Sequence, residues 1–346
     1  MDVMIGIDPH KRSHTAVVVD SQGEVLDQLR IAADRRQLAL LVAFAEKWPR
    51  RRFAVEGANG LGRLLAQQLL EAGETVIDVP PTLSARVRLL SGGSARKTDA
   101  HDARSTAIAA LHGARLRMVA AEDLTVVLRL LSDRRDQLSR ERNRIVCRLH
   151  DQFRDLREGG AKLNLTADQA ARLLKGIRPV GLVATQRRQL ARELLADLRR
   201  VDKQLVDIDE RIVEAVTATK TTLTDIVGVG SVLAATIIGH AGDITRFADR
   251  GHFASYAGVA PIEASSGDVR RHRLSRRGNR RLNAAIHMVA LGQLSHPSSG
   301  RDYYDRKLSE GKTRREALRA LKRQLANVIW RHLVADADAT DLATAA

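Results

Sequence analysis

The sequence has few of the residues that stabilise small secreted proteins or anchor a chain in a membrane. Its 346 residues include one cysteine, Cys147, which excludes an internal disulfide framework and a zinc cluster of several thiolates. No apolar run is long enough to span a bilayer, and the first residues, MDVMIGIDPHKRSH, lack the charged start and apolar core of a signal peptide. We therefore expect a soluble, cytoplasmic protein without a membrane partner.

Aromatic residues are also scarce, whereas basic residues are in excess. At 3% of the composition, aromatic side chains are too few for base stacking to dominate the binding of a nucleic acid. Lysine and arginine number 57 against 41 aspartates and glutamates, which gives a net charge of +16. Such an excess favours a polyanionic partner, and the lack of membrane signals makes nucleic acid the stronger candidate.

The order of patterns along the chain predicts three folded regions and a tail. A length of 346 residues with 44% hydrophobic content is sufficient for two or three buried cores. We expect a mixed α/β domain, a helical coiled-coil region, a basic all-helical domain and a disordered tail, over residues 1–115, 116–218, 219–334 and 335–346.

Strand and helix signals alternate in the first region. Runs rich in β-branched residues predict strands, and apolar residues at helical spacing predict helices between them. The strands are expected over 3–8, 14–20, 53–57 and 75–81, and the helices over 36–48, 61–73 and from residue 98 onward. This alternation is typical of an α/β domain with a mixed sheet.

The second region carries two seams of apolar residues separated mainly by steps of three, four and seven. Such spacing is typical of a coiled coil or a long helical hairpin. The arginines between the seams fit a solvated face better than a DNA-reading surface. The first seam is Leu131, Leu138, Ile145, Leu149 and Leu156, and the second is Leu190, Leu194, Leu198, Val201, Leu205, Ile208 and Ile212.

Four acidic residues of the first region lie where a metal site can form. Asp8 and Glu56 each end a predicted strand, in IGID and FAVEG, where ligands commonly gather in α/β sheets. Asp99 and Asp102, in RKTDAHDAR, lie on one face of the next helix. Any one of them alone is explained as a cap or a solvated turn, but four that converge need a cation between them.

Oxygen ligands of this kind suit Mg²⁺ or Mn²⁺ rather than zinc. Two such ions about 4 Å apart could activate an attacking oxygen and stabilise a leaving one in phosphoryl transfer. His10, His14 and His101 are close to these acids in sequence. We interpret the three histidines as solvated or as neighbours of the ligands, because a hard-metal site needs no imidazole.

A second informative stretch, IEASSGDVRRHRLSRRGNRR, places serines beside a dense arginine cluster. A serine hydroxyl in a glycine-containing loop can approach a phosphate, and neighbouring guanidinium groups can neutralise its charge. A plain polar turn is the alternative interpretation of Ser265, Ser266 and Gly267. The candidates for phosphate contact are Arg270, Arg271, Arg273, Arg276, Arg277, Arg280 and Arg281.

The VGVG motif is a weaker candidate for a nucleic-acid contact. Gly228 and Gly230 allow a tight turn whose backbone N–H groups could bind a phosphate, as in a helix-hairpin-helix element. A plain connection between two helices explains the same residues equally well. The sequence contains no zinc finger, RNP motif or leucine-zipper basic region, so no module that reads bases is evident.

Seven short motifs occur in order along the chain: GIDPHK, VEG, KTDAHDA, VGVG, FASYAGVAP, SSG and LSRRGNRRL. Together they resemble the DEDD transposases of the insertion-sequence-110 family, relatives of the Piv invertase, over nearly the whole chain. The resemblance implies an N-terminal RuvC-like domain with an RNase H-like fold. It also implies that Asp8, Glu56, Asp99 and Asp102 are the catalytic metal ligands.

The resemblance further implies a serine nucleophile and a guide RNA. The position that matches the family's nucleophile is Ser266, with Ser265 one residue away. Its attack on DNA would give a phosphoserine–DNA intermediate, followed by strand exchange and religation. A bridge RNA that pairs with donor and target DNA is implied as the guide. Because recombination needs several strands cut in concert, we expect a dimer that assembles into a tetramer. The resemblance implies a composite site, with the carboxylates of one protomer facing Ser266 of another.

Two other functions stay open from the residues alone. A metal-dependent, structure-specific nuclease, such as a junction resolvase, would use the carboxylates with water as the nucleophile. A non-catalytic nucleic-acid-binding protein would use the acidic residues only as caps, and its binding would weaken with salt. We expect an enzyme, a DNA transposase or recombinase, ahead of both.

Overall fold

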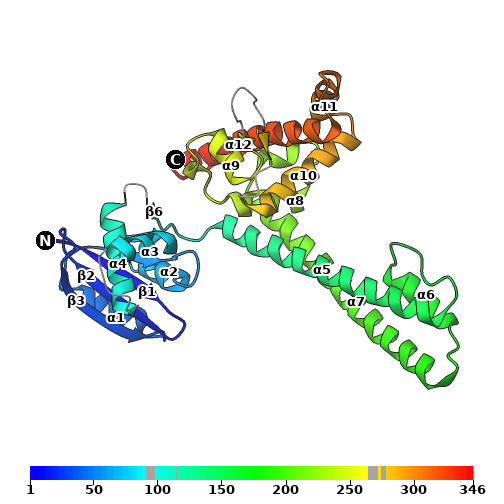
Figure 1. The fold of residues 1–346 in the computed structure, drawn as a ribbon, viewed down its shortest axis with the longest axis horizontal. Helices are drawn as coiled ribbons and strands as arrows, with labels where there is room; N and C mark the ends of the chain where they lie inside the picture. Colours follow the sequence, from blue (N-terminus) through cyan, green and yellow to red (C-terminus); the bar gives the residue numbers. More distant parts are fainter. Residues whose placement is uncertain (91–97, 114–115, 264–271, 274–277, 346) are drawn as a thin grey trace. The chain divides into compact units, whose positions relative to one another are not determined.

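The computed structural model describes most of the chain and divides it into two compact units (Figure 1). The first unit is Met1–Glu122 and the second is Asp123–Ala346. The residues described are 1–90, 98–113, 116–263, 272–273 and 278–345. None of the helices in these ranges is both long and apolar enough to cross a membrane.

The first unit is built on a six-stranded mixed sheet. Its strands are β1 (Asp2–Pro9), β2 (Ser13–Val19), β3 (Val25–Ala32), β4 (Arg50–Glu56), β5 (Val76–Val79) and β6 (Arg117–Met118), in the order β3-β2-β1-β4-β5-β6. Strands β1, β4 and β5 are parallel, whereas β2, β3 and β6 each run antiparallel to a neighbour. The sheet fits the RNase H-like domain that the resemblance implied.

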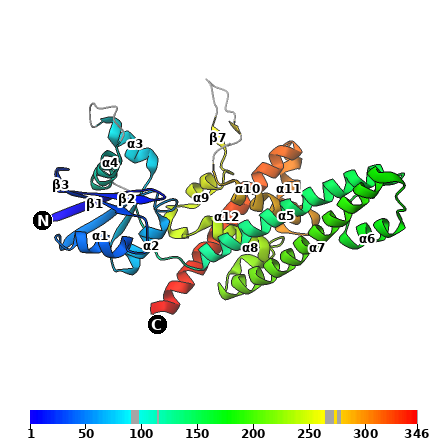
Figure 2. The ribbon, with the colours of Figure 1, turned by 90° about the horizontal axis from the view of Figure 1, so that it is seen from below.

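Four helices cover the two faces of this sheet: α1 (Gln37–Ala45), α2 (Arg63–Glu71), α3 (Pro81–Leu90) and α4 (Asp99–His112). Helices α1 and α2 lie on one face, and α3 and α4 lie on the other (Figure 2). Successive side chains of a strand point to opposite faces of the sheet, so β1 contacts both pairs of helices. Ile5 packs toward α1 and α2, and Met4 packs toward α3 and α4. The sequence predicted no helix at α3, because its prolines looked like the end of a strand, but a helix can begin on a proline such as Pro81.

Two long helices dominate the second unit, as the apolar seams predicted. Helix α5 (Leu124–Leu156) packs against α7 (Gly181–Ala218), and the short α6 (Ala167–Gly176) lies between them in sequence. The pair is antiparallel, because Arg135 contacts Asp209 and the later Arg142 contacts the earlier Asp202, each with Nε 2.6 Å from Oδ1. Most seam residues are buried, although Leu190 is exposed and Leu156, Leu194 and Leu205 are only partly covered.

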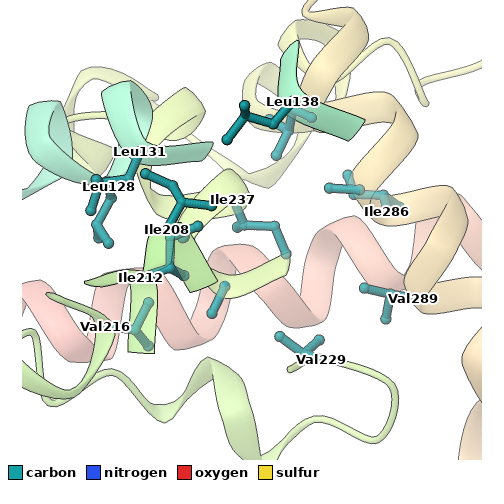
Figure 3. Close-up of a cluster of buried hydrophobic side chains, with 14 of the residues drawn as sticks. Leu128, Leu131, Leu138, Ile208, Ile212, Val216, Val229, Ile237, Ile286 and Val289 are labelled. Carbon is teal, nitrogen blue, oxygen red and sulfur yellow. The ribbon is translucent and has the colours of Figure 1, made fainter. Parts of the chain in front are cut away.

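The remaining elements are the 3-10 helices η1 (Thr222–Asp225) and η2 (Ile244–Arg246), the strands β7 (Ile262–Glu263) and β8 (His272–Arg273), and the helices α8 (Ser231–Ala241), α9 (Arg250–Tyr256), α10 (Arg280–Ser295), α11 (Ser299–Ser309) and α12 (Arg314–Ala345). Helix α8 packs against the long helix pair, and η1, η2, α9, α10 and α12 add buried side chains to the same core. Figure 3 shows side chains of α5, α7, α8 and α10 meeting in one apolar cluster. The regions 116–218 and 219–334, predicted as separate domains, therefore share one core from α5 onward.

Helix α12 continues over residues 335–345, where the sequence predicted a disordered tail. Asp336 explains the difference, because it joins this part of the helix to the start of η1. Its carboxylate accepts hydrogen bonds from Thr221 Oγ1 at 2.6 Å and from the backbone N–H of Thr222 at 3.1 Å. The alanines that follow also have the highest helix propensity, so the residues that looked like a tail extend the helix.

Candidate functional site

The end of β1 presents Asp8 to the helix that crosses the sheet above it. Residues Met4, Gly6 and Asp8 alternate onto the same face of the strand, and Met4 packs in the core beside Ala103 and Ala107 of α4. The side chain of Asp8 is only 8% exposed. The first predicted ligand thus lies buried under the N-terminal part of α4.

Gly6 is the reason why α4 can lie so close to β1. A Cβ atom at this position would lie 2.1 Å from the backbone oxygen of Ala103 and 2.6 Å from the backbone nitrogen of Ala107. Only glycine leaves room for the helix backbone to rest directly on the strand. The glycine of the IGID motif therefore sets the distance between the helix and Asp8.

The start of α4 holds the next two predicted ligands. Thr98 caps the helix, since its side chain accepts a hydrogen bond from the N–H of His101 at 3.3 Å. Asp99 and Asp102 occupy the first turn, where the positive end of the helix dipole favours negative charge. Asp102 is buried, and Asp99 is 37% exposed at its side chain.

Glu56 ends β4, directly beside the end of β1. The parallel register pairs Ile7 with Val55, so that the residues that follow, Asp8 and Glu56, leave the sheet at the same edge. The turn after Glu56 is fixed by Asp78 of β5, which accepts hydrogen bonds from the N–H of Ala58 at 2.9 Å and from Asn59 Nδ2 at 2.6 Å. Asp78 gave no other signal in the sequence than an acidic residue within a predicted strand, so its role in this turn could not be predicted.

Within the part of the chain that the structure describes, Asp8, His10 and Asp99 form a group of possible metal ligands. One ligand atom from each lies within 4.8 Å of the other two. Glu56 and Asp102 do not join this group, although both lie at the same end of the unit, through β4 and α4. The structure thus brings together two of the four predicted carboxylates and adds an imidazole that the sequence argument had set aside.

Positive side chains accompany the carboxylates. Arg30 Nη2 of β3 lies 3.4 Å from Asp99 Oδ2, and Arg88 of α3 forms an ion pair with Asp102. His10 Nδ1 lies 3.5 Å from Asp8 Oδ2. These contacts offset the repulsion between acids that lie close together, and a divalent cation with oxygen ligands fits the same arrangement.

The other histidines of this region have different surroundings. His14 is buried on β2 and its Nε2 lies 3.0 Å from Gln37 Oε1, and burial lowers its pKa below the usual 6.5. His101 is exposed on α4. Neither belongs to the group at Asp8, so His14 acts in packing and His101 faces solvent.

The predicted serine site falls largely outside the residues that the structure describes. Ser265, Ser266, Gly267, Arg270, Arg271, Arg276 and Arg277 all lie there, and of Arg273 only the backbone in β8 is described. Strands β7 and β8 pair antiparallel, with Ile262 opposite Arg273 and Glu263 opposite His272. The two paired strands thus flank the segment that contains both serines.

The two chain segments that flank these paired strands are held together by hydrogen bonds. The N–H of Asn279 donates to the backbone oxygen of Tyr256 at 2.7 Å. Asn283 Nδ2 donates to the backbone oxygens of Ala257 and Gly258 at 3.0 and 2.9 Å. Gly278, at φ +101°, lies against Tyr256 and leaves no space for a Cβ. The motifs SYAG and GN thus form one structural element.

Lys322 of α12 supports this element from the other side and was not found from the sequence. Its Nζ donates to Asn283 Oδ1 at 2.7 Å, and burial lowers the pKa of its ammonium group. The bond fixes which way the Asn283 amide points, so that its NH₂ faces the two carbonyls. A lysine within a basic helix gave no signal of this role.

The described members of the arginine cluster have different surroundings. Arg281 Nη1 lies 2.5 Å from Asp136 Oδ2 of α5, and its Nε lies 3.8 Å from Asp133 Oδ1. Arg280, one residue earlier, is exposed. Arg281 therefore joins α10 to α5, and Arg280 is the better placed of the two for a phosphate.

The glycines of VGVG lie in the turn between η1 and α8. Gly228, at φ +88°, packs against α10, since a Cβ there would lie 3.1 Å from the backbone oxygen of Val289. Gln293 of α10 donates to the backbone oxygen of Val227 at 3.0 Å. Gly230 precedes Ser231 as the N-cap of α8 and has open space around it. Packing explains Gly228, and Gly230 keeps the possibility of a phosphate contact.

Two family models match the chain. Residues 5–157 match a DEDD transposase model named for IS110, and residues 220–305 match the model described as the transposase IS116/IS110/IS902 family. The first match contains Asp8, Glu56, Asp99 and Asp102, and the second contains both serines and the arginine cluster.

Curated relatives match along nearly their full lengths. The uncharacterized 44.8 kDa protein of insertion element IS116 from Streptomyces clavuligerus is 29% identical, with 95% of this chain and 94% of the relative covered. The uncharacterized 42 kDa protein of insertion element IS900 from Mycobacterium paratuberculosis is 28% identical at the same coverage.

Among solved structures, two of RuvC match the chain in part. RuvC of T. thermophilus in complex with a Holliday junction substrate is 19% identical with a TM-score of 0.27, and the match covers 32% of this chain and 94% of that one. A second structure of Thermus thermophilus RuvC is 18% identical with a TM-score of 0.28, and the match covers 34% and 99%.

Proposed function

This chain belongs to the DEDD transposases of the IS110 family and is an enzyme that acts on DNA, and we propose from that premise that it cuts and rejoins DNA strands through a serine nucleophile. In this proposal Asp8, Glu56, Asp99 and Asp102 hold Mg²⁺ or Mn²⁺, and Ser266 becomes linked to DNA. The donor and target DNA are selected by a bridge RNA.

The observation that carries the proposal is the approach of Asp99 to Asp8. Their carboxylate oxygens lie within 4.8 Å of each other although the residues are 91 positions apart in the sequence. A cap or a solvated turn needs no such partner. The direct contact of α4 with Gly6 sets how closely the start of the helix approaches Asp8.

The four carboxylates would hold a divalent cation, and such an ion supplies activation of the attacking oxygen and neutralisation of charge on the phosphate. Asp8 and Asp99, whose carboxylate oxygens lie within 4.8 Å of each other, would share the ion, with Glu56 and Asp102 beside them. Arg30 and Arg88, which pair with Asp99 and Asp102, would be available to the phosphate when the carboxylates turn toward the metal.

The proposed covalent step uses the hydroxyl of Ser266. Its oxygen forms a bond to the phosphorus as the bond to one DNA oxygen breaks, the serine proton is lost to a base, and the departing DNA oxygen takes up a proton. Attack by a DNA hydroxyl on the phosphoserine reverses these changes and restores the serine. Because one phosphodiester is exchanged for another, rejoining needs no nucleotide triphosphate.

The described residues on either side of the serine segment support this role for Ser266. Asn279 and Asn283 tie the end of α9 to the start of α10. A nucleophile needs such support, because a displacement of about 1 Å can reduce the rate by on the order of 100-fold. The exposed Arg280 follows directly, where a phosphate contact would orient the strand.

A bridge RNA is proposed because the protein is basic and shows no module that reads bases. The net charge of +16 suits binding to phosphate backbones. Base pairing between a guide and the DNA would supply the missing specificity. Dimers that assemble into tetramers are proposed as well, since strand exchange requires several strands to be cut together.

One experiment tests the nucleophile and the guide together. Purified protein is incubated with Mg²⁺ and a nicked DNA substrate that loses the cleaved end, and protein–DNA adducts are detected on a denaturing gel. We expect an adduct with the wild type and with Ser265→Ala, and none with Ser266→Ala or Asp102→Asn. Treatment with RNase should abolish the adduct, and return of the co-purified RNA should restore it.

The outcomes separate the proposal from its alternatives. DNA cleavage without an adduct would indicate a metal-dependent nuclease that uses water, and Ser266 would then be structural. An adduct that persists in Ser266→Ala would remove this serine from the mechanism. An adduct that withstands RNase and forms without RNA would contradict the guide.

A further inference from the structure

His10 lies within the group of carboxylates rather than outside it. Its Nδ1 is 3.5 Å from Asp8 Oδ2, and a ligand atom of each of Asp8, His10 and Asp99 lies within 4.8 Å of the others. The imidazole is 47% exposed, so it keeps freedom to adjust. His10 therefore lies beside both acids while about half of its side chain stays exposed.

The spacing of these atoms suits one six-coordinate cation. With metal–ligand distances of about 2.1 Å, adjacent ligands of an octahedron lie about 3.0 Å apart and opposite ligands about 4.2 Å apart. The observed separation of 3.5 Å between Nδ1 and Oδ2 is about 0.5 Å longer than the spacing of adjacent ligands, so the two groups would have to close by this amount around an ion. The partly exposed imidazole of His10 has room for such an adjustment.

The backbone holds His10 in position at the end of the first hairpin. Strand β1 ends at Pro9, which fixes φ and pairs with His14 of β2. The N–H of His10 donates to the backbone oxygen of Ser13 at 2.9 Å, which closes the turn. The side chain that follows Asp8 by two positions is thereby kept on the side of the sheet edge where Asp8 ends.

We propose that His10 is a nitrogen ligand of the cation held by Asp8 and Asp99, and that it shifts the preference of this site from Mg²⁺ toward Mn²⁺. The proposal rests on the metal site of the proposed function and makes it more specific. Magnesium strongly prefers oxygen ligands and retains its waters, whereas transition-metal ions accept imidazole more readily. A site of carboxylates alone would lack this preference.

The test uses the full-length, metal-free protein with Mn²⁺ as the probe. Affinity is measured by titration with electron paramagnetic resonance, and Mg²⁺ is measured by its competition against Mn²⁺. Pulsed resonance then detects a nitrogen atom bound to the manganese. The variant is His10→Asn, which offers an oxygen of similar reach, and the matched control is His101→Asn, an exposed histidine on α4 outside the group.

We expect nitrogen coupling in the wild type and in His101→Asn, and its loss in His10→Asn. The Mn²⁺ affinity of His10→Asn should fall by about tenfold or more, with a smaller change for Mg²⁺. The proposal would be overturned if His10→Asn kept both the nitrogen coupling and the wild-type ratio of Mn²⁺ to Mg²⁺ affinity. Mn²⁺ binding without nitrogen coupling in the wild type would overturn it as well. Either result would leave the carboxylate site intact. If Asp99→Asn binds Mn²⁺ as tightly as the wild type, the carboxylate site itself is wrong, and His10 loses its role with it.

Discussion

Replacement of Gly6 by alanine should damage the metal site from a position that has no chemistry of its own. The added Cβ would lie 2.1 Å from the backbone oxygen of Ala103, and the lower limit of ordinary contact is 3.4 Å. Helix α4 would have to withdraw by the difference of about 1.3 Å, or β1 would have to bend. No side chain can yield instead, because the atoms in the way are the backbone oxygen of Ala103 and the backbone nitrogen of Ala107.

We expect Gly6→Ala to lower the stability of the protein moderately and to weaken metal binding and DNA cleavage more strongly. Such overpacking typically lowers the free energy of unfolding by about 1–3 kcal/mol. Metal sites tolerate errors of about 0.2 Å in ligand distance, so a shift of Asp99 and Asp102 by about 1 Å should weaken Mn²⁺ binding strongly and reduce strand cleavage by on the order of 100-fold.

Three measurements on Gly6→Ala examine this reasoning: urea unfolding, Mn²⁺ titration and formation of the protein–DNA adduct. The control is Gly176→Ala at the end of α6, where a Cβ meets nothing within 4 Å. A folded Gly6→Ala protein that binds Mn²⁺ and cleaves DNA like the wild type would show that the distance between α4 and β1 does not govern the site.

Two further predictions concern an ion-pair cluster and a buried histidine. Arg281→Gln should lower the free energy of unfolding by about 1 kcal/mol, because it breaks the contact with Asp136. Arg280→Gln should leave stability unchanged. It should instead reduce the slope of the logarithm of the DNA-binding constant against the logarithm of salt concentration by about one. Urea unfolding and binding at several salt concentrations separate the two, and equal stability losses would contradict the assignment. Burial lowers the pKa of His14, so the unfolded chain takes up the proton first, and stability should be full above about pH 6.5 and fall as the pH drops below it. Urea midpoints at about pH 7.5 and about pH 5.5 should show a larger acid-induced loss for the wild type than for His14→Gln, and similar losses in both proteins would contradict this cause.

The positions of the carboxylates could be predicted because each follows from a local rule. Asp8 and Glu56 end hydrophobic runs, and parallel strands bring such ends to one edge of a sheet. Asp99 and Asp102 follow a capping threonine at helical spacing. Patterns of this kind depend on neighbours in the sequence, so one chain is sufficient to recognise them.

Features that depend on distant residues could not be found in this way. The closeness of His10 to Asp99 depends on how α4 crosses β1, and the role of Lys322 depends on how α12 reaches Asn283. Helix α12 was cut short in the prediction because the bond from Thr221 to Asp336 spans 115 residues. In each case the sequence shows an ordinary polar residue, and only the tertiary contact gives it a function.

The ion pairs at the carboxylates also bear on how the metal binds. A group of acids without partners would lose stability through their mutual repulsion, and binding of a cation would be its only relief. Here Arg30 and Arg88 already pair with Asp99 and Asp102, so a cation held as proposed would compete with a guanidinium for each carboxylate. Part of the binding free energy of such a cation would then be used to release the arginines. The released side chains carry the charge and the paired N–H groups that bind a phosphate, so that metal binding and DNA binding at this edge of the sheet should favour one another.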